Sequence, residues 1–191
     1  QQCIRKQYKH KRAGLRILTM NAGDTIIQLK YGVFMEKFYQ TMLSNIRKHP
    51  LLQKIIMGFT RYIPIITFIV YSILLVYLLY TQNTLLAKTL YKPLASFLIV
   101  TLLRKVINRK RPYEAMAIDP LIEHKQGESF PSRHTVSAFA IALACLQVNS
   151  LLGTIMLILA FVVSCSRILS GVHYISDVLS AVIIALIISF L

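Results

Sequence analysis

Acidic side chains are scarce in this chain of 191 residues, which carries 7 Asp and Glu against 22 Lys and Arg. So few carboxylates offer no convincing acidic cluster for a metal ion. Cysteines number only three, and Cys145 and Cys165 lie inside apolar runs, where a thiol behaves as a small hydrophobic group. The sequence therefore gives no indication of a disulfide framework or a metal site, and it holds no internal repeat or low-complexity segment.

Hydrophobic residues make up 55% of the chain, and several apolar runs are long enough to cross a bilayer. We therefore predict an integral membrane protein, and the length favours a single domain. The net charge of +15 is uneven, because residues 1–61 hold twelve of the Lys and Arg residues. Beside so apolar a remainder, this charge is expected to meet anionic lipid headgroups and not nucleic acid, unless it is only a solvated tail.

Residues 1–34 differ from the rest in being polar and basic, without a sustained period and without the apolar core of a signal peptide. Because Met35 reads like a natural start, we interpret 1–34 as a basic extension, non-native or disordered. Over residues 35–59 apolar side chains recur at helical spacing with Lys and Arg between them, and Pro50 is expected to break the helix. This pattern predicts an amphipathic interfacial helical region before a transmembrane domain of residues 60–191.

The transmembrane domain contains five apolar segments separated by polar connections. The segments are residues 63–80, 85–107, 134–148, 151–165 and 173–191. They predict an all-α helical bundle with about five transmembrane helices, or six if residues 42–59 also cross. Since successive spans alternate in direction, the end of the second, the start of the third, the end of the fourth and the start of the fifth share one face. Three charged segments are therefore expected to converge there: residues 104–112, 131–134 and 167–173.

The segment from Ser166 to Asp177 carries the first candidate catalytic group. His173 and Asp177 are four residues apart, so on a helix they lie on one face, and a carboxylate there would fix the tautomer of the imidazole. Gly171 allows the chain to turn between Arg167 and His173. An Arg, a His and an Asp beside an apolar helix indicate phosphoryl transfer, in which His173 attacks phosphorus, Asp177 supports it and Arg167 holds the oxygens. The alternative is that the His is only a cap or a satisfied polar group.

Two further charged segments supply candidates for phosphate binding. Ser132 precedes a predicted helix, either as an N-cap or as a group that binds phosphate together with the free N–H groups of the helix start. His134 beside it is a candidate general acid for the leaving group. Arg104 and Arg111 are seven residues apart and share one face if the helix continues that far, although Lys and Arg also commonly flank a span. Arg offers forked donors that match phosphate oxygens.

These segments resemble the signature motifs of the type 2 phosphatidic acid phosphatase superfamily, over residues from about 60 to 191. The family patterns are Lys-x6-Arg-Pro, Pro-Ser-Gly-His and Ser-Arg-x5-His-x3-Asp, and the third matches at every fixed position. In the first pattern, Arg104 stands in place of Lys, with Lys105 adjacent as an alternative cation. In the second, Arg133 stands in place of Gly, where it can add a phosphate donor. Vanadium-dependent haloperoxidases share the motifs, but they resemble soluble helical proteins, unlike this chain.

The resemblance implies a metal-independent phosphatase without a cofactor. His173 would form a phosphohistidine, Asp177 would orient it, and His134 would protonate the leaving group. The residues that would bind the phosphate are Arg104, Arg111, Ser132, Arg133 and Arg167.

The substrate that the resemblance implies is a lipid phosphate in the bilayer, of the phosphatidic acid, phosphatidylglycerol phosphate or undecaprenyl pyrophosphate type. It also implies a bacterial cytoplasmic membrane with the active site on the extracytoplasmic face. Two alternatives stay open: a phosphatase or phosphotransferase for a soluble phosphate ester, and a catalytically weak lipid-binding membrane protein in which Arg133 is the disabling change. The motifs bind the phosphate and not the tail, so they do not choose among these substrates, and they do not indicate an oligomeric state.

Overall fold

The computed structural model describes residues 22–122 and 126–191, with side chains from residue 32 onward. Much of the predicted basic extension, residues 1–21, lies outside the described residues. The chain forms two compact units, Gln1–Gln40 and Thr41–Leu191. Helix α2 (Ala22–Lys48) contains the boundary between them, and all candidate site residues belong to the second unit.

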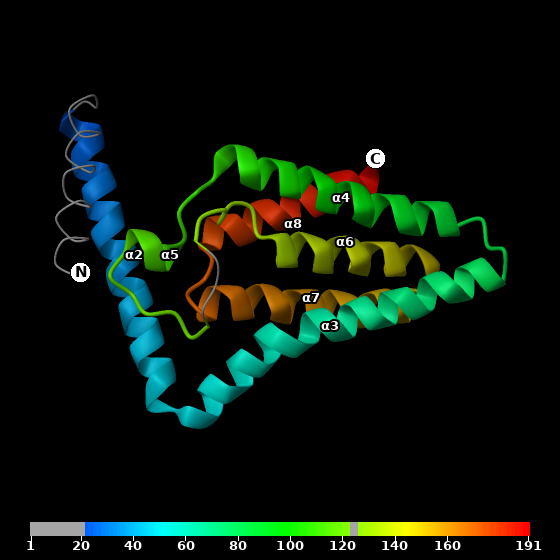
Figure 1. Cartoon of the computed structure of the whole chain (residues 1–191), viewed down its shortest axis with the longest axis horizontal. Helices are drawn as coiled ribbons and strands as arrows, with labels where there is room; N and C mark the ends of the chain where they lie inside the picture. Colours follow the sequence, from blue (N-terminus) through cyan, green and yellow to red (C-terminus); the bar gives the residue numbers. More distant parts are fainter. Residues whose placement is uncertain (1–21, 123–125) are drawn as a thin grey trace. The chain divides into compact units, whose positions relative to one another are not determined.

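The second unit is all-helical, as the sequence predicts, and the described parts of the chain contain no strand. Figure 1 shows its helices in order, coloured from cyan to red. After α2 they are α3 (Pro50–Tyr80), α4 (Leu86–Ile107), the short α5 (Pro112–Ala115), α6 (Arg133–Val148), α7 (Ser150–Leu169) and α8 (Ile175–Phe190).

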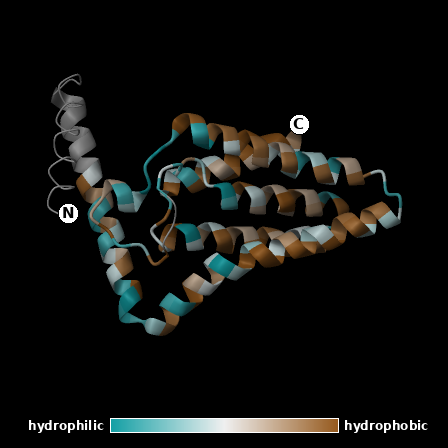
Figure 2. Ribbon diagram, in the orientation of Figure 1, coloured by the Kyte–Doolittle hydropathy of each residue, from teal (hydrophilic) through white to brown (hydrophobic). Residues whose placement is uncertain are grey.

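Helices α3, α4 and α7 are long and apolar enough to cross a membrane, whereas α6 and α8, with 16 residues each, are shorter apolar helices. Hydrophobic residues run along most of the length of these helices (Figure 2). Only 28%, 22% and 39% of the apolar stretches of α3, α4 and α7 are buried inside the protein. Most of their apolar side chains therefore face outward, as side chains in contact with lipid do, and the protein is an integral membrane helical bundle.

Helix α6 is the central element of the bundle, in contact with α3, α4, α7 and α8. Its buried side chains are small, and Ala138, Ala142 and Cys145 join a hydrophobic cluster with residues of α3 and α7. The close approach of α6 and α7 depends on Gly153, because a Cβ there would lie 2.2 Å from the Cα of Leu146. This packing holds α6 in place, and the site begins at its N-terminus.

The helix of the first span begins earlier than predicted. Helix α3 starts at Pro50 and runs unbroken to Tyr80, so residues 42–59 do not form a crossing of their own. Proline at the first position of a helix needs no hydrogen-bond partner for its nitrogen, which is why the break falls just before it.

Helix α4 ends at Ile107, because Asn108 adopts a left-handed conformation with φ of 41°. Arg111 therefore lies outside the helix that contains Arg104. The condition under which these two arginines would share one helix face is therefore not met, although both side chains reach the same region by another route.

Helix α8 begins at Ile175, so His173 lies in the turn before it. The prediction that His173 and Asp177 share one helix face is therefore wrong. Gly171 makes the turn after α7 as predicted, with φ of 75°, a value that glycine adopts without strain.

The three charged segments converge at one end of the bundle, as the alternation of the spans predicts. Figure 1 shows the end of α4, the start of α6, the end of α7 and the start of α8 at that same end. Two hydrogen bonds join the segments: Arg104 Nη1 donates to the Pro131 carbonyl at 3.0 Å, and Arg111 Nη1 donates to the Val172 carbonyl at 3.2 Å.

Candidate active site

Asp177, in the first turn of α8, is fully buried, and each of its carboxylate oxygens is bonded. Oδ1 lies 2.7 Å from Arg109 Nη1. Oδ2 accepts hydrogen bonds from the backbone N–H of Tyr174 at 3.0 Å and from the Ser129 hydroxyl, and it lies 3.5 Å from His173 Nδ1. The Tyr174 bond is part of a capping box, so one carboxylate both starts the helix and faces the imidazole.

His173 is 1% exposed, in the turn that Gly171 makes possible. Burial lowers the pKa of His173 to about 4; Asp177 opposes this shift, and the positive charges of Arg111 and Arg104 reinforce it. The ring is therefore neutral at neutral pH. Asp177 Oδ2 faces Nδ1 at 3.5 Å, and a proton on Nδ1 would leave Nε2 with the lone pair that a nucleophile needs.

Three arginines from three helices or loops are buried at this end of the bundle: Arg104, Arg111 and Arg167 are 5%, 3% and 4% exposed. Arg111 Nε donates to the Gly127 carbonyl at 3.0 Å, and Arg167 Nη2 donates to the Thr60 carbonyl at 2.9 Å.

Within the described residues, the Nε groups of Arg104 and Arg167 have no hydrogen-bond partner. A buried donor without an acceptor is unfavourable, and an anion that enters between these side chains would supply the acceptor. The arginine cluster is therefore suited to hold a phosphate, as the sequence predicts for each of its members.

Ser132 occupies the N-cap position of α6, but its side chain makes no capping bond. Its hydroxyl instead accepts a hydrogen bond from the Thr135 hydroxyl at 3.0 Å, and its backbone N–H donates to the Asp177 carbonyl at 3.0 Å. Ser132 thus lies at the predicted N-cap position, but its side chain does not cap the helix. The first N–H groups of a helix have no acceptor within the helix, so a helix start such as that of α6 is a position at which an anion can bind.

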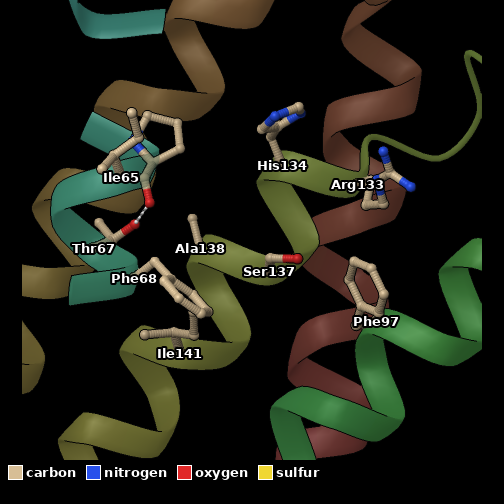
Figure 3. Close-up of a pocket in the computed structure, with 10 residues that line it drawn as sticks. Ile65, Thr67, Phe68, Phe97, Arg133, His134, Ser137, Ala138 and Ile141 are labelled. Atoms are coloured by element: carbon tan, nitrogen blue, oxygen red, sulfur yellow. Dashed lines mark hydrogen bonds between the residues drawn. The ribbon is translucent and has the colours of Figure 1, made fainter. Parts of the chain in front are cut away.

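His134 and Arg133 lie on the open side of the site. Both line a pocket of about 340 Å³ between α3, α4 and α6, and Figure 3 shows their side chains at its upper end. The remaining lining is mostly apolar and includes Ile65, Phe68 and Phe97. His134 is half-buried, Arg133 is exposed, and the guanidinium carbon of Arg133 lies 5.8 Å from the centre of the Phe97 ring.

Lys105 differs from the other candidates in its surroundings. It is exposed on α4, one residue after the buried Arg104, and it does not line the pocket. The geometry therefore favours Arg104 for the position at which the family pattern has Lys.

The loop from Met116 to Ser132 is tied to the site by polar contacts that the sequence did not reveal. Glu128 lies 3.8 Å from Arg104, and Glu114 accepts a hydrogen bond from the Gly127 N–H at 2.6 Å. Gly127 has φ of 71°, and a Cβ there would lie 2.7 Å from the side-chain oxygen of Asn108. The loop therefore depends on glycine at this position.

Arg109 and Ser129 are the functional candidates that sequence reasoning missed. Arg109 donates to the Ser176 hydroxyl at 2.8 Å as well as to Asp177, and its guanidinium lies 4.1 Å from the centre of the Tyr174 ring. The basic character of residues 104–112 includes Arg109, but nothing in the local pattern separates it from its neighbours. Among the residues described, no group of three or more His, Cys, Asp or Glu side chains is arranged to hold a metal ion.

Residues 66–191 match the model of the PAP2 superfamily. The chain belongs to this family. Undecaprenyl-diphosphatase BcrC of Bacillus subtilis (strain 168) is 39% identical to the chain over 98 residues, which cover 51% of each protein. Bacitracin transport permease protein BcrC of Bacillus licheniformis is 36% identical over 103 residues, which cover 51% of this chain and 49% of the relative. The chain thus spans about half the length of these two relatives.

Two solved structures have the same fold, each with a TM-score of 0.65. Aquifex aeolicus LpxE, at 23% identity, matches over 81% of this chain and 91% of its own. The PAP2-type phosphatidylglycerolphosphate phosphatase of Bacillus subtilis, at 21% identity, matches over 96% and 93%. The resemblance inferred from the three motifs is confirmed, and so is the all-helical membrane fold.

Proposed function

We propose that this PAP2 protein is a membrane lipid phosphatase that removes the terminal phosphate of a lipid diphosphate or lipid monophosphate through a phosphohistidine. The observation that carries the proposal is the buried His173–Asp177 pair, 3.5 Å apart, beside the cluster of three buried arginines. A neutral imidazole, a carboxylate that faces it, and buried positive charges are what phosphoryl transfer to a histidine would need.

In the proposed reaction, Nε2 of His173 attacks phosphorus. The bond between phosphorus and the leaving oxygen breaks, and the leaving oxygen takes the electron pair and a proton from His134. Water then attacks the phosphohistidine and gives a proton to His134, and inorganic phosphate leaves. These steps restore both histidines. Arg104, Arg111 and Arg167 would stabilise the equatorial oxygens throughout.

The pocket beside His134 supports a lipid as the substrate. It extends from the two polar side chains at its upper end along the apolar residues of α3 and α6 (Figure 3). A soluble phosphate ester would leave this apolar lining without a partner, whereas an acyl or prenyl chain would bury it. The sequence likeness to an undecaprenyl-diphosphatase supports the prenyl diphosphate among the lipid substrates.

Phosphate release from the purified protein in detergent tests the proposal. With EDTA present, we expect turnover of farnesyl diphosphate and phosphatidic acid, much slower turnover of glucose 6-phosphate, and inhibition by vanadate, which can adopt the five-coordinate geometry of the reaction. Loss of activity in EDTA that magnesium restores would contradict the mechanism. Turnover of glucose 6-phosphate alone would favour a soluble substrate, and no turnover at all would favour a lipid-binding protein.

We also propose that the active face lies outside the cytoplasm, a proposal that rests on the family motifs. By the positive-inside rule, the basic residues of this face would place it in the cytoplasm. The buried arginines among them would serve the site, so they need not be counted under that rule. In a variant without native cysteines, an impermeant maleimide added to intact cells should label Gln126→Cys, which is exposed on the active-face loop, and not Asn83→Cys. The reverse labelling would place the site inside.

A further inference from the structure

Arg133 stands where the family motif has glycine, and its side chain is a group that the general PAP2 mechanism does not use. We infer that Arg133 binds the phosphate that stays on the lipid when a diphosphate is cleaved, and that this contact makes the protein prefer lipid diphosphates to lipid monophosphates. The inference rests on the proposed phosphatase function and adds a substrate class and a specificity residue to it.

The surroundings of Arg133 differ from those of Arg104 and Arg109. Arg104 and Arg109 each lie near a carboxylate, of Glu128 and Asp177 respectively. Within the described residues Arg133 has no ion pair, and its nearest ring contact is with Phe97 at 5.8 Å. An exposed arginine without a carboxylate is common on a protein surface. Here, however, the side chain lines the pocket next to His134, so it meets whatever occupies the upper end of that pocket (Figure 3).

The order of the groups fits two adjacent phosphates. In the proposed mechanism, the buried Arg104, Arg111 and Arg167 would hold the transferred phosphate beside His173. Arg133 follows Ser132 directly in the chain and lies within electrostatic range of Arg104, but it is exposed towards the pocket. A diphosphate whose terminal phosphate is held by the buried arginines would therefore have its second phosphate at Arg133 and His134, and its chain in the apolar part of the pocket.

A lipid diphosphate and a lipid monophosphate differ in the leaving group that departs from phosphorus. When Nε2 of His173 attacks the terminal phosphorus of a diphosphate, the bond to the bridging oxygen breaks and the departing lipid monophosphate gains the negative charge. Arg133 would neutralise that charge while His134 supplies the proton. With a lipid monophosphate the leaving group is an alkoxide on an apolar chain, and Arg133 has no second phosphate to bind. A charge-assisted hydrogen bond of this kind changes an equilibrium or rate by about ten- to a hundredfold.

The test compares farnesyl diphosphate with farnesyl monophosphate, which share one tail. We expect Arg133→Gln and Arg133→Gly to lower kcat/KM for the diphosphate at least about tenfold more than kcat/KM for the monophosphate. Arg133→Lys should keep part of the preference, because it retains the charge without the forked donors. The matched control is Lys110→Gln, which removes the same charge from an exposed residue outside the pocket and should leave the ratio unchanged. An equal loss on both substrates would overturn the inference and leave the phosphatase function standing.

A binding measurement keeps the inference testable even if the proposed hydrolysis fails. The wild-type protein should bind a non-hydrolysable methylene analogue of farnesyl diphosphate at least about tenfold more tightly than farnesyl phosphonate, and Arg133→Gln should abolish the difference. Equal binding of the two analogues by the wild-type protein would contradict the inference directly, whether or not any substrate is turned over.

Discussion

The two halves of the candidate site differ in how far they are closed before substrate arrives. On one side, His173 is 1% exposed and Asp177 is fully buried. The Asp177 carboxylate accepts hydrogen bonds from Arg109, Ser129 and the backbone N–H of Tyr174. On the other side, Arg133 is exposed and His134 is half-buried, and both line the pocket.

The difference in burial fits the different roles that the two halves would have in the reaction, one towards the nucleophile and one towards the leaving group. A nucleophile has to be neutral and oriented when phosphorus approaches, and a fixed network of hydrogen bonds meets this need without reorganisation during the reaction. The groups that bind the leaving side of the substrate have to admit a bulky lipid, so they need space. Both halves meet at the start of α6, where the N–H of Ser132 bonds to the carbonyl of Asp177.

The largest predicted effects separate the two halves by their leaving-group dependence. Asp177→Asn acts on the nucleophile and should slow turnover of farnesyl diphosphate and phosphatidic acid by a similar factor, about 10² to 10⁴, provided attack is rate-limiting. His134→Ala removes the acid and should harm phosphatidic acid more, because its alkoxide leaving group needs the proton more than a phosphate does. The comparison requires both substrates with both variants. If the diphosphate rescues Asp177→Asn and not His134→Ala, the two roles are reversed.

A smaller effect is predicted for Arg109, which would act as a positioning residue through Asp177. The charged groups that face His173 are Asp177, Arg104 and Arg111, and in Arg109→Gln the carboxylate loses its nearest cation. The carboxylate then favours the protonated imidazole more strongly, so the pKa of His173 rises. The acid limb of the kcat/KM profile should move to higher pH by about one unit, since the protonated ring cannot attack.

Arg109→Lys should restore most of the profile, because it keeps the positive charge beside the carboxylate. A uniform loss of activity at every pH in Arg109→Gln, without a shift of the acid limb, would show that Arg109 only supports the fold.

The smallest effect on catalysis is predicted for Gly153→Ala, which disturbs the bundle far from either half. The added Cβ would meet the backbone of Leu146, and such overpacking costs about 1–3 kcal/mol. The midpoint of thermal unfolding in detergent should fall, while kcat of the folded protein stays close to the wild-type value. Gly58→Ala is the control, since a Cβ there meets nothing within 4 Å and should not lower the midpoint. A large loss of kcat at an unchanged midpoint would couple this packing to the site.

The sequence predicts the spans well because a residue that is buried or in contact with lipid is apolar, so each long apolar run marks a span directly. Helices α4, α6 and α7 begin within a residue of the predicted positions. The end of α4 at Ile107 agrees with the predicted end of the second segment, and the helix stops there because Asn108 is left-handed. The start of α3 was missed because Lys54 and Arg61 made the segment after Pro50 look interfacial.

For the site, the sequence predicts the residues of the three motifs, since each motif is local and the alternation of spans brings them to one end. It does not predict Arg109 or Ser129, whose partner Asp177 lies 68 and 48 residues further along the chain. Contacts between residues so far apart in the chain depend on the fold and leave no local pattern in the sequence. The Ser132 hydroxyl, a possible cap of α6, instead accepts a hydrogen bond from the Thr135 hydroxyl three residues further along the chain.

The most direct test of the account is to trap the covalent intermediate. Farnesyl diphosphate labelled with ³²P in its terminal phosphate is mixed with the protein and quenched within milliseconds in alkali, which preserves phosphohistidine. The account predicts label on His173, none in His173→Ala although that variant still folds in detergent, and more label in wild-type protein quenched before the steady state than after substrate is exhausted. Label on another residue, or wild-type turnover by His173→Ala, would contradict it.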